Sequence, residues 1–323
     1  MRQVEDNMEA GRISIAGIDV AKAHLDVGLY GTDQVRRFTN DGPGVGELIH
    51  WLGDQGVVRV GLEATGGYER KVMRALQEAG LAVIRHQPLE VRLFARLHRI
   101  RAKNDRIDAL VIAAITAQAS TPGAPVRAGL DDLAEWLTAY EQVSDQRAQL
   151  KTFCEHVHLS DLRVHYDGLI DQCRAIKAAL LAEIRNRIRT EPSLARRYDL
   201  LQSLPGIGAV VSAVLLVRMP ELGSLERGQA ASLIGVAPFD RDSGLFKGSR
   251  KISGGRSRPR RFVYIAALAA KRSRTPFATF ANRLKDNGKR PKVVIVAVMR
   301  KLIEAANIVL KRASPWVPEA QPT

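Results

Sequence analysis

Short apolar runs and amphipathic segments alternate along the first part of the chain. Runs at residues 13–20, 24–30 and 34–39 have the length and composition of strands. They are followed by a predicted helix at 44–55, a strand at 57–62, a helix at 69–79, a strand at 81–85 and helical sequence at 89–119. This order predicts an α/β domain with a mixed sheet.

The pattern changes after the turn-forming sequence TPGAP at residues 121–125. Two long stretches then carry mainly apolar residues at alternating spacings of four and three. These residues are Trp136, Tyr140, Val143, Arg147, Leu150, Cys154 and Val157 in the first stretch, and Leu169, Cys173, Ile176, Leu180, Ile184 and Ile188 in the second. The spacing indicates two packed helices. They would form either a coiled-coil arm for spacing or oligomerisation, or an ordinary helical hairpin in one core.

A third region follows from about residue 198 to residue 311. It contains LPGIG at 204–208 between two helical patterns, a glycine- and arginine-rich stretch at 243–261, and helical patterns at 262–271 and 291–311. We therefore expect three domains: an α/β domain over 1–125, a helical arm over 126–196, and a mainly α C-terminal domain over 197–323 with a segment that resembles a helix-hairpin-helix.

Composition excludes several classes of protein. A hydrophobic content of 46% and a charged content of 26% are ordinary for a globular chain of 323 residues. No stretch approaches the roughly 18 uncharged apolar residues of a membrane span, and the first twelve residues lack the apolar core of a secretion signal. Cys154 and Cys173 have no metal-site spacing. We expect a cytoplasmic protein that has no membrane partner.

The positive charge is confined to one segment. The net charge is +15 and the pI is about 10.2, which favours a polyanionic partner. Residues 241–300 contain 17 Lys and Arg against two acidic residues, a surplus equal to the net charge of the whole chain. Such a segment indicates a nucleic-acid-binding surface. Aromatic residues make up only 5%, so base stacking is not the expected main mode of recognition.

Four acidic residues occupy positions that suit metal binding. Asp19 ends the first predicted strand and Glu63 ends the fourth, while Asp105 and Asp108 are three residues apart on one face of a predicted helix. Converging carboxylates could bind two Mg²⁺ ions, with Mn²⁺ as a substitute, and such ions clamp the attacking and leaving oxygens of a phosphodiester. Each acid also has a simpler interpretation, as a turn residue, as a solvated helix face, or, for Asp105, as a helix cap. The joint order of the four favours the metal site.

Five sequence blocks together resemble one protein family. GIDVAKAHLDV, GLEATGGYE and AKNDRIDA, followed by LPGIG and by the block that runs from Ser243-Gly244 through KGSRK, are similar to the signatures of the DEDD transposases of the IS110 insertion-sequence family. The resemblance implies that the first domain has an RNase H-like fold similar to that of the RuvC Holliday-junction resolvase. It also implies that Asp19, Glu63, Asp105 and Asp108 form the catalytic, metal-binding tetrad.

The resemblance also selects one serine. From the residues alone, Ser243 has no claim over the other serines of its segment, and most serines in such loops bind phosphate or cap helices. The family implies that Ser243 attacks the phosphodiester and forms a transient phosphoserine link. The residues expected to contact nucleic acid are Gly206, Gly208, Lys247, Arg250, Lys251, Arg256, Arg258, Arg260 and Arg261.

The expected function is therefore that of a DNA transposase or recombinase. The resemblance implies donor and target DNA and a structured noncoding guide RNA as partners, and we expect a homo-oligomer, either a dimer or a tetramer. Two alternatives stay open at this point. One is a RuvC-like structure-specific endonuclease that uses metal-activated water; the other is a non-catalytic nucleic-acid-binding protein.

Overall fold

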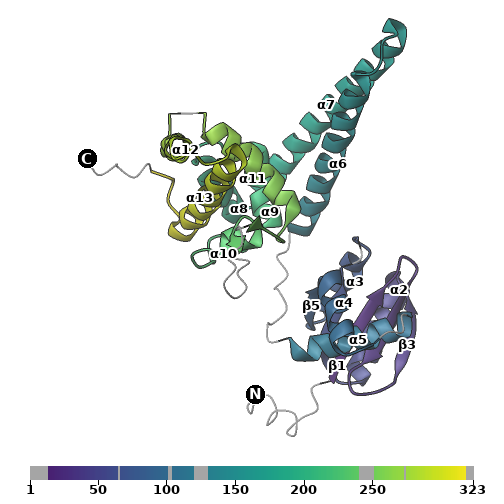
Figure 1. The fold of residues 1–323 in the computed structure, drawn as a ribbon. Coiled ribbons are helices and arrows are strands. Elements are labelled where there is room, and N and C mark those ends of the chain that lie inside the picture. The colour runs from purple at the N-terminus through teal and green to yellow at the C-terminus, as the bar shows by residue number, and fades with distance from the viewer. Residues whose placement is uncertain are drawn as a thin grey trace. The chain divides into compact units, whose positions relative to one another are not determined.

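The chain forms two compact units, Met1–Arg127 and Ala128–Thr323 (Figure 1). The structure is a computed structural model, and it describes residues 14–64, 66–100, 104–119, 130–239, 251–272 and 274–317. Ser243, Lys247, Arg250 and the boundary predicted at 121–125 lie outside these described residues. The division into three domains therefore stays a prediction.

A five-stranded sheet forms the centre of the first unit. Its strands are β1 (Ser14–Val20), β2 (His24–Leu29), β3 (Val35–Thr39), β4 (Val57–Glu63) and β5 (Ala82–His86). The strand order is β3-β2-β1-β4-β5. Strand β2 runs in the direction opposite to that of the other four strands. A mixed sheet of this order is the arrangement of an RNase H-like fold, so the predicted fold class of this region is confirmed.

The described part of the first unit also contains four helices, three of which pack on the two faces of the sheet. They are α2 (Gly42–Asp54), α3 (Glu69–Glu78), α4 (Pro88–Leu97) and α5 (Asp105–Gln118). Alternate strand residues such as Ile18 and Leu62 are fully buried in one core with Leu48 and Leu76 from α2 and α3. The residues between them in sequence face α5, which packs on the opposite side and is itself covered by α4 through Val91 and Ile112.

The helical sequence predicted over 89–119 forms two separate helices, so the prediction of one helical element there is wrong. Helix α4 ends at Leu97, and Arg99 then adopts a positive φ of 57° that interrupts the helical path. Helix α5 begins after Asn104, whose side chain accepts a hydrogen bond from the Ile107 N–H at 2.8 Å. Asn104, and not Asp105, is therefore the cap, which leaves the side chain of Asp105 available for other contacts.

A row of glycines lets α5 lie directly on the sheet. Gly28, Gly17 and Gly61 are neighbours in register on β2, β1 and β4. A Cβ atom at Gly17 would clash with the backbone of Ala109 and Ala113 in α5. Side chains at these positions would push the helix away, so the glycines determine how closely α5 approaches the strands.

The second unit is mainly α-helical, as predicted. Its elements are α6 (Leu130–Cys154), α7 (Ser160–Thr190), α8 (Pro192–Gln202), α9 (Ala209–Arg218), α10 (Gln229–Leu233), β6 (Pro238–Phe239), β7 (Lys251–Ile252), α11 (Ser257–Ala270), α12 (Pro276–Asp286) and α13 (Pro291–Arg312). Figure 1 shows α6 and α7 as a long antiparallel hairpin whose far end projects from the other helices of this unit. In the part of the chain that the structure describes, no helix is long and apolar enough to cross a membrane.

The two ends of the hairpin are packed differently. At its base, Leu137, Ile184 and Ile188 are almost completely buried in the core that α8 to α13 also form. Toward its tip, large apolar side chains remain exposed, namely Phe153, Leu159, Leu162, Val164 and Leu169. The base is therefore part of one helical core, and the outer part extends beyond that core.

Candidate active site

Two of the predicted acids lie at the same end of one sheet face. Asp19 follows Gly17 by two residues on β1, and Glu63 follows Gly61 by two residues on β4. Since side chains alternate along a strand, both carboxylates lie on the face that the glycines present to α5. The parallel pairing of β1 with β4 brings the ends of these strands together.

The other two predicted acids reach Asp19 from the first turn of α5. The pKa of Asp19 is raised from 3.8 to about 6, first by its burial and then by the negative charges of Asp108, Asp105, Glu63 and Asp26, in that order. The structure therefore places Asp105, Asp108 and Glu63 close enough to Asp19 to disfavour its ionisation.

This donor set fits a hard divalent cation. The groups around Asp19 are carboxylates, which are the oxygen ligands that such ions prefer. Burial first, and then repulsion by the other carboxylates, raises the pKa of Asp19, and a bound cation would offset that repulsion. Asp19, Glu63, Asp105 and Asp108 are the residues that would hold the ion.

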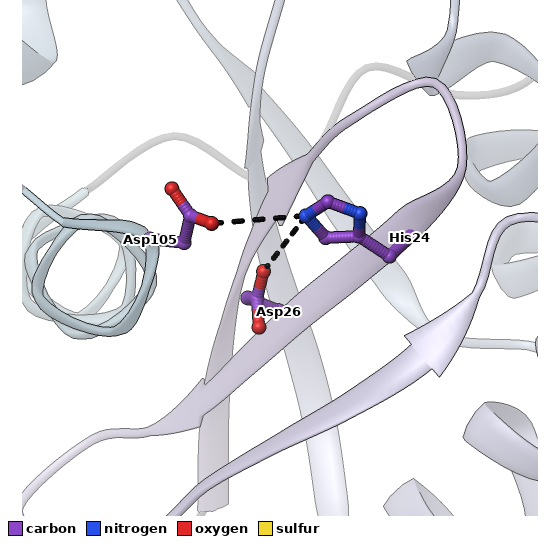
Figure 2. A group of neighbouring side chains, drawn as sticks. All are labelled: His24, Asp26 and Asp105. Carbon is purple, nitrogen blue, oxygen red and sulfur yellow. Dashed lines mark ion pairs between the residues drawn. The ribbon is translucent and has the colours of Figure 1, made fainter.

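Two further side chains, His24 and Asp26, belong to the same region, and our sequence reasoning did not identify them. Figure 2 shows His24 and Asp26 from β2 beside Asp105 from α5. The Nε2 atom of His24 lies 3.5 Å from Oδ2 of Asp26 and 3.7 Å from Oδ2 of Asp105. Ligand atoms of these three residues lie within 4.8 Å of one another. The block GIDVAKAHLDV could have revealed them. His24 and Asp26 alternate there with the buried Leu25, so both side chains lie on the sheet face that α5 covers.

Arg37 on β3 places a positive charge beside Asp26 and Asp105. Its Nε and Nη2 atoms donate to Oδ1 and Oδ2 of Asp26, each at 2.8 Å, and Nη2 also donates to Oδ2 of Asp105 at 3.0 Å. The single positive charge of the guanidinium thus offsets part of the negative charge on these two carboxylates. We therefore interpret His24, Asp26 and Asp105 as an ion-pair network, and not as a separate cation site.

Two arginines expected to bind phosphate are bound within the second unit. Arg256 donates to both carboxylate oxygens of Glu221, at 2.9 and 2.7 Å, and to the carbonyl oxygen of Arg218 at 2.7 Å. Arg260 donates to the carbonyl oxygen of Gly254 at 2.7 Å. Both side chains hold the start of α11 in place, which is a structural role that the sequence did not reveal.

Two more arginines of α11 contact acids of the hairpin. Arg258 donates to Oε2 of the buried Glu141 at 2.9 Å, and Arg261 donates to Asp145. Both arginine side chains are nevertheless more than half exposed. Lys251 on β7 is exposed as well. These three residues keep surface that a phosphate backbone could reach.

The LPGIG segment connects α8 to α9. Gly206 has a φ of +84°, and a Cβ atom there would clash with Ala266 and Ala270 of α11, so packing alone requires a glycine. Gly208 caps α9 with an extended backbone, and its Cβ position is open. Of the two glycines, Gly208 is the one whose surroundings leave room for an approaching ligand.

The basic segment also contains a pocket that sequence reasoning missed. It has a volume of about 580 Å³ and lies at the start of α12. Lys271, Arg272 and Arg274 line it together with the cap residue Thr275. The sequence feature that could have revealed this pocket is the basic run KRSR, which stands just before a proline that begins a helix.

Comparisons with known proteins assign the family. A model of IS110 DEDD proteins, described as a transposase, matches residues 16–159, and a model described as a transposase of the IS116/IS110/IS902 family matches residues 198–282. The chain is 28% identical over 311 residues to the pilin gene-inverting proteins of Moraxella bovis and Moraxella lacunata, which covers 93% of this chain and 96% of each relative.

Two further similarities cover smaller parts of the chain. An uncharacterized 42 kDa protein of insertion element IS900 from Mycobacterium paratuberculosis is 28% identical over 134 residues, which is 38% of this chain and 32% of that protein. Among solved structures, RuvC of T. thermophilus in complex with a Holliday junction substrate matches 35% of this chain and 99% of its own, with 19% identity and a TM-score of 0.27. The first family model spans nearly all of the described part of the first unit and continues into the α6–α7 hairpin, the second lies within the second unit, and we conclude that the chain belongs to the IS110 family of transposases.

Proposed function

We propose that this transposase cuts and rejoins DNA by using Mg²⁺ held by Asp19, Glu63, Asp105 and Asp108. The observation that carries the proposal is the position of the four acids, because paired strands β1 and β4 end in Asp19 and Glu63 and the first turn of α5, which packs on these strands, holds Asp105 and Asp108. Burial first, and then the charges of the other acids, raise the pKa of Asp19, which agrees with this arrangement. Two ions are proposed, and Mn²⁺ is expected to substitute for Mg²⁺. Bound ions of this type stabilise charge on the attacking and leaving oxygens of a phosphodiester.

Ser243 is the proposed nucleophile. Its Oγ atom would attack the phosphorus, so that an Oγ–P bond forms and one P–O bond to a DNA sugar breaks. The sugar oxygen leaves as a hydroxyl, and its proton balances the one that the serine loses. Attack by the hydroxyl of another strand reverses the step and releases the serine, which rejoins DNA without ATP. This requires Ser243 to reach the acids of the first unit, within one subunit or across an interface of a dimer or tetramer.

The similarity to relatives named for pilin gene inversion favours a recombinase over the alternative function. Inversion of a DNA segment needs both cutting and rejoining. A RuvC-like structure-specific endonuclease would use the same tetrad with metal-activated water and would only cut. The alternative therefore differs from the proposal in lacking a covalent protein–DNA intermediate.

The test is to trap that intermediate. Protein and DNA are incubated with Mg²⁺ and denatured in detergent, and the covalent adduct is measured on a gel. We expect an adduct that Ser243→Ala abolishes and that Ser253→Ala, a change in the same basic segment, leaves in place. Strand nicking that continues in Ser243→Ala, with no adduct from the wild-type protein, would establish the endonuclease instead.

Donor DNA, target DNA and a noncoding guide RNA are the proposed partners. The exposed side chains of Arg258 and Arg261 and the pocket lined by Lys271, Arg272 and Arg274 support binding to phosphate backbones. A basic surface with few aromatic residues suits recognition of duplex shape, which is how double-stranded RNA is bound in most cases. We therefore propose recognition through the backbone and not through stacked bases.

The outer part of the α6–α7 hairpin is the proposed site of oligomerisation. A shortened hairpin tests this, in which a tight turn replaces residues 148–169 and the buried base around Leu137 and Ile184 is kept. We expect light scattering to give a smaller assembly, because the exposed apolar residues near the tip are lost. Circular dichroism checks that the helical unit still folds. An assembly of unchanged mass would exclude the tip as the interface.

A further inference from the structure

We propose that Arg37 is a positioning residue, which is held by Asp26 and fixes the carboxylate of Asp105 in the metal-binding set. The proposal rests on the metal site proposed above. Arg37 and Asp26 lie outside the predicted tetrad, and they contact it through Asp105.

The anchor of this arrangement is Asp26. It is only 5% exposed, and it lies directly opposite Arg37 in the β2–β3 pairing. Both of its carboxylate oxygens accept from the guanidinium at 2.8 Å. A two-point pair of this kind fixes the plane of the guanidinium as well as its position, which a lysine cannot do.

The anchored guanidinium then reaches Asp105. Its Nη2 atom bridges Oδ2 of Asp26 and Oδ2 of Asp105. The contact directs one oxygen of Asp105 toward β3 and thereby fixes the orientation of the whole carboxylate. A second link acts on the same helix end, because Arg106 donates to the carbonyl oxygen of Asp33 in the β2–β3 turn at 2.8 Å.

Asp105 needs such a tether for two reasons. Its side chain is 55% exposed, so packing does not restrict its rotamer. The carboxylates around Asp19 also repel it, and rotation into solvent would relieve that repulsion. When a group that hydrogen-bonds and orients a metal ligand is removed, metal affinity typically falls by about 10- to 100-fold.

A positioning role and a simple charge effect predict changes of opposite sign. If Arg37 acted only through its charge, its removal would strengthen cation binding, since a nearby positive charge repels the metal. If Arg37 positions Asp105, its removal weakens binding although the site becomes more negative. The direction of the change therefore separates the two roles.

The experiment measures Mn²⁺ binding to the full-length protein by electron paramagnetic resonance, without DNA. We expect Arg37→Met to weaken binding by about 10-fold or more. Arg37→Lys keeps the charge but loses the two-point pair, so it should also bind more weakly. The matched control is Arg36→Met, which removes the same charge one position earlier on β3, where the guanidinium lies over the ring of Phe38. Its affinity should stay within about twofold of wild type, because exposed distant charges are screened.

The outcomes are distinguishable. Equal or tighter binding by a folded Arg37→Met protein overturns the positioning role, and so does an equal loss in Arg36→Met. Asp19→Asn tests the metal site itself, because its unchanged affinity would refute the proposed function and not this inference alone. Circular dichroism reports whether each variant folds. If Arg37→Met does not fold, unchanged binding by Arg37→Lys overturns the proposal and weaker binding supports it.

Discussion

Gly17→Ala is expected to lower the free energy of unfolding of the first unit by about 3 kcal/mol or more. The added methyl group would overlap the backbone of Ala109 and Ala113, which cannot move aside as a flexible side chain can. Helix α5 must therefore shift away from the sheet, and contacts along β1, β2 and β4 are lost with it. Urea denaturation measures the change.

Gly46→Ala is the matched control. Gly46 lies inside α2, and its Cβ position is open. The same substitution there should raise the free energy of unfolding by about 0.5–1 kcal/mol, because alanine favours helix more than glycine does. A Gly17→Ala protein as stable as wild type would show that α5 does not lie directly on the strands.

The same variant should also lose DNA cleavage. Asp105 and Asp108 belong to the first turn of α5, and Asp19 lies two residues beyond Gly17. A shift of the helix changes the distances between these carboxylates, and metal sites tolerate little displacement. We therefore expect cleavage to fall even under conditions in which the variant remains folded.

Asp19→Asn is expected to stabilise the metal-free protein at neutral pH. The pKa of Asp19 is about 6 in the folded chain, above its ordinary value of 3.8. As the pH rises through this window, the unfolded chain releases its proton while the folded chain keeps it, so the wild-type protein loses stability. Asparagine does not titrate. The free energy of unfolding of the variant should therefore exceed that of wild type by an amount that grows from about pH 4 and is complete above about pH 6. After allowance for solvent screening, the full difference is about 2 kcal/mol.

In Mg²⁺ the wild-type protein should become more stable than Asp19→Asn. Wild type should gain stability from Mg²⁺ because the ion binds the folded state alone, whereas Asp19→Asn should gain little and should not cleave DNA. Denaturation in EDTA and in Mg²⁺ at several pH values measures both effects. Asp33→Asn changes an exposed acid of the same unit and serves as the control. A stability difference that is the same at all pH values would show that the pKa of Asp19 is not raised in the folded protein.

Local sequence was sufficient for most elements of the first unit. The apolar runs predicted β1 to β5 within a few residues, because strands that are buried on both faces leave short, nearly continuous apolar runs in the sequence. The prediction from local sequence failed between α4 and α5, where the cap residue Asn104 starts a second helix. One polar side chain at a helix end has little effect on the hydrophobic pattern of a long segment.

Charge counting was less informative in the second unit. The arginines of the basic segment were expected to face nucleic acid, yet Arg256 and Arg260 bind groups of their own unit. A count of charged residues cannot distinguish an arginine that binds phosphate from one that forms hydrogen bonds within its own unit. Only the positions in space of the Glu221 side chain and of the Gly254 carbonyl distinguish the two roles.

The sequence by itself determined the family, the candidate tetrad and the order of strands and helices, because these depend on residue type and spacing. Tertiary structure decided how the acids act together. The charges that act on Asp19, the place of α5 on the glycine row and the hydrogen bond from Arg37 to Asp105 all join segments far apart in the chain. Electrostatic and packing energies depend on distances in space, and spacing along the chain does not specify these distances.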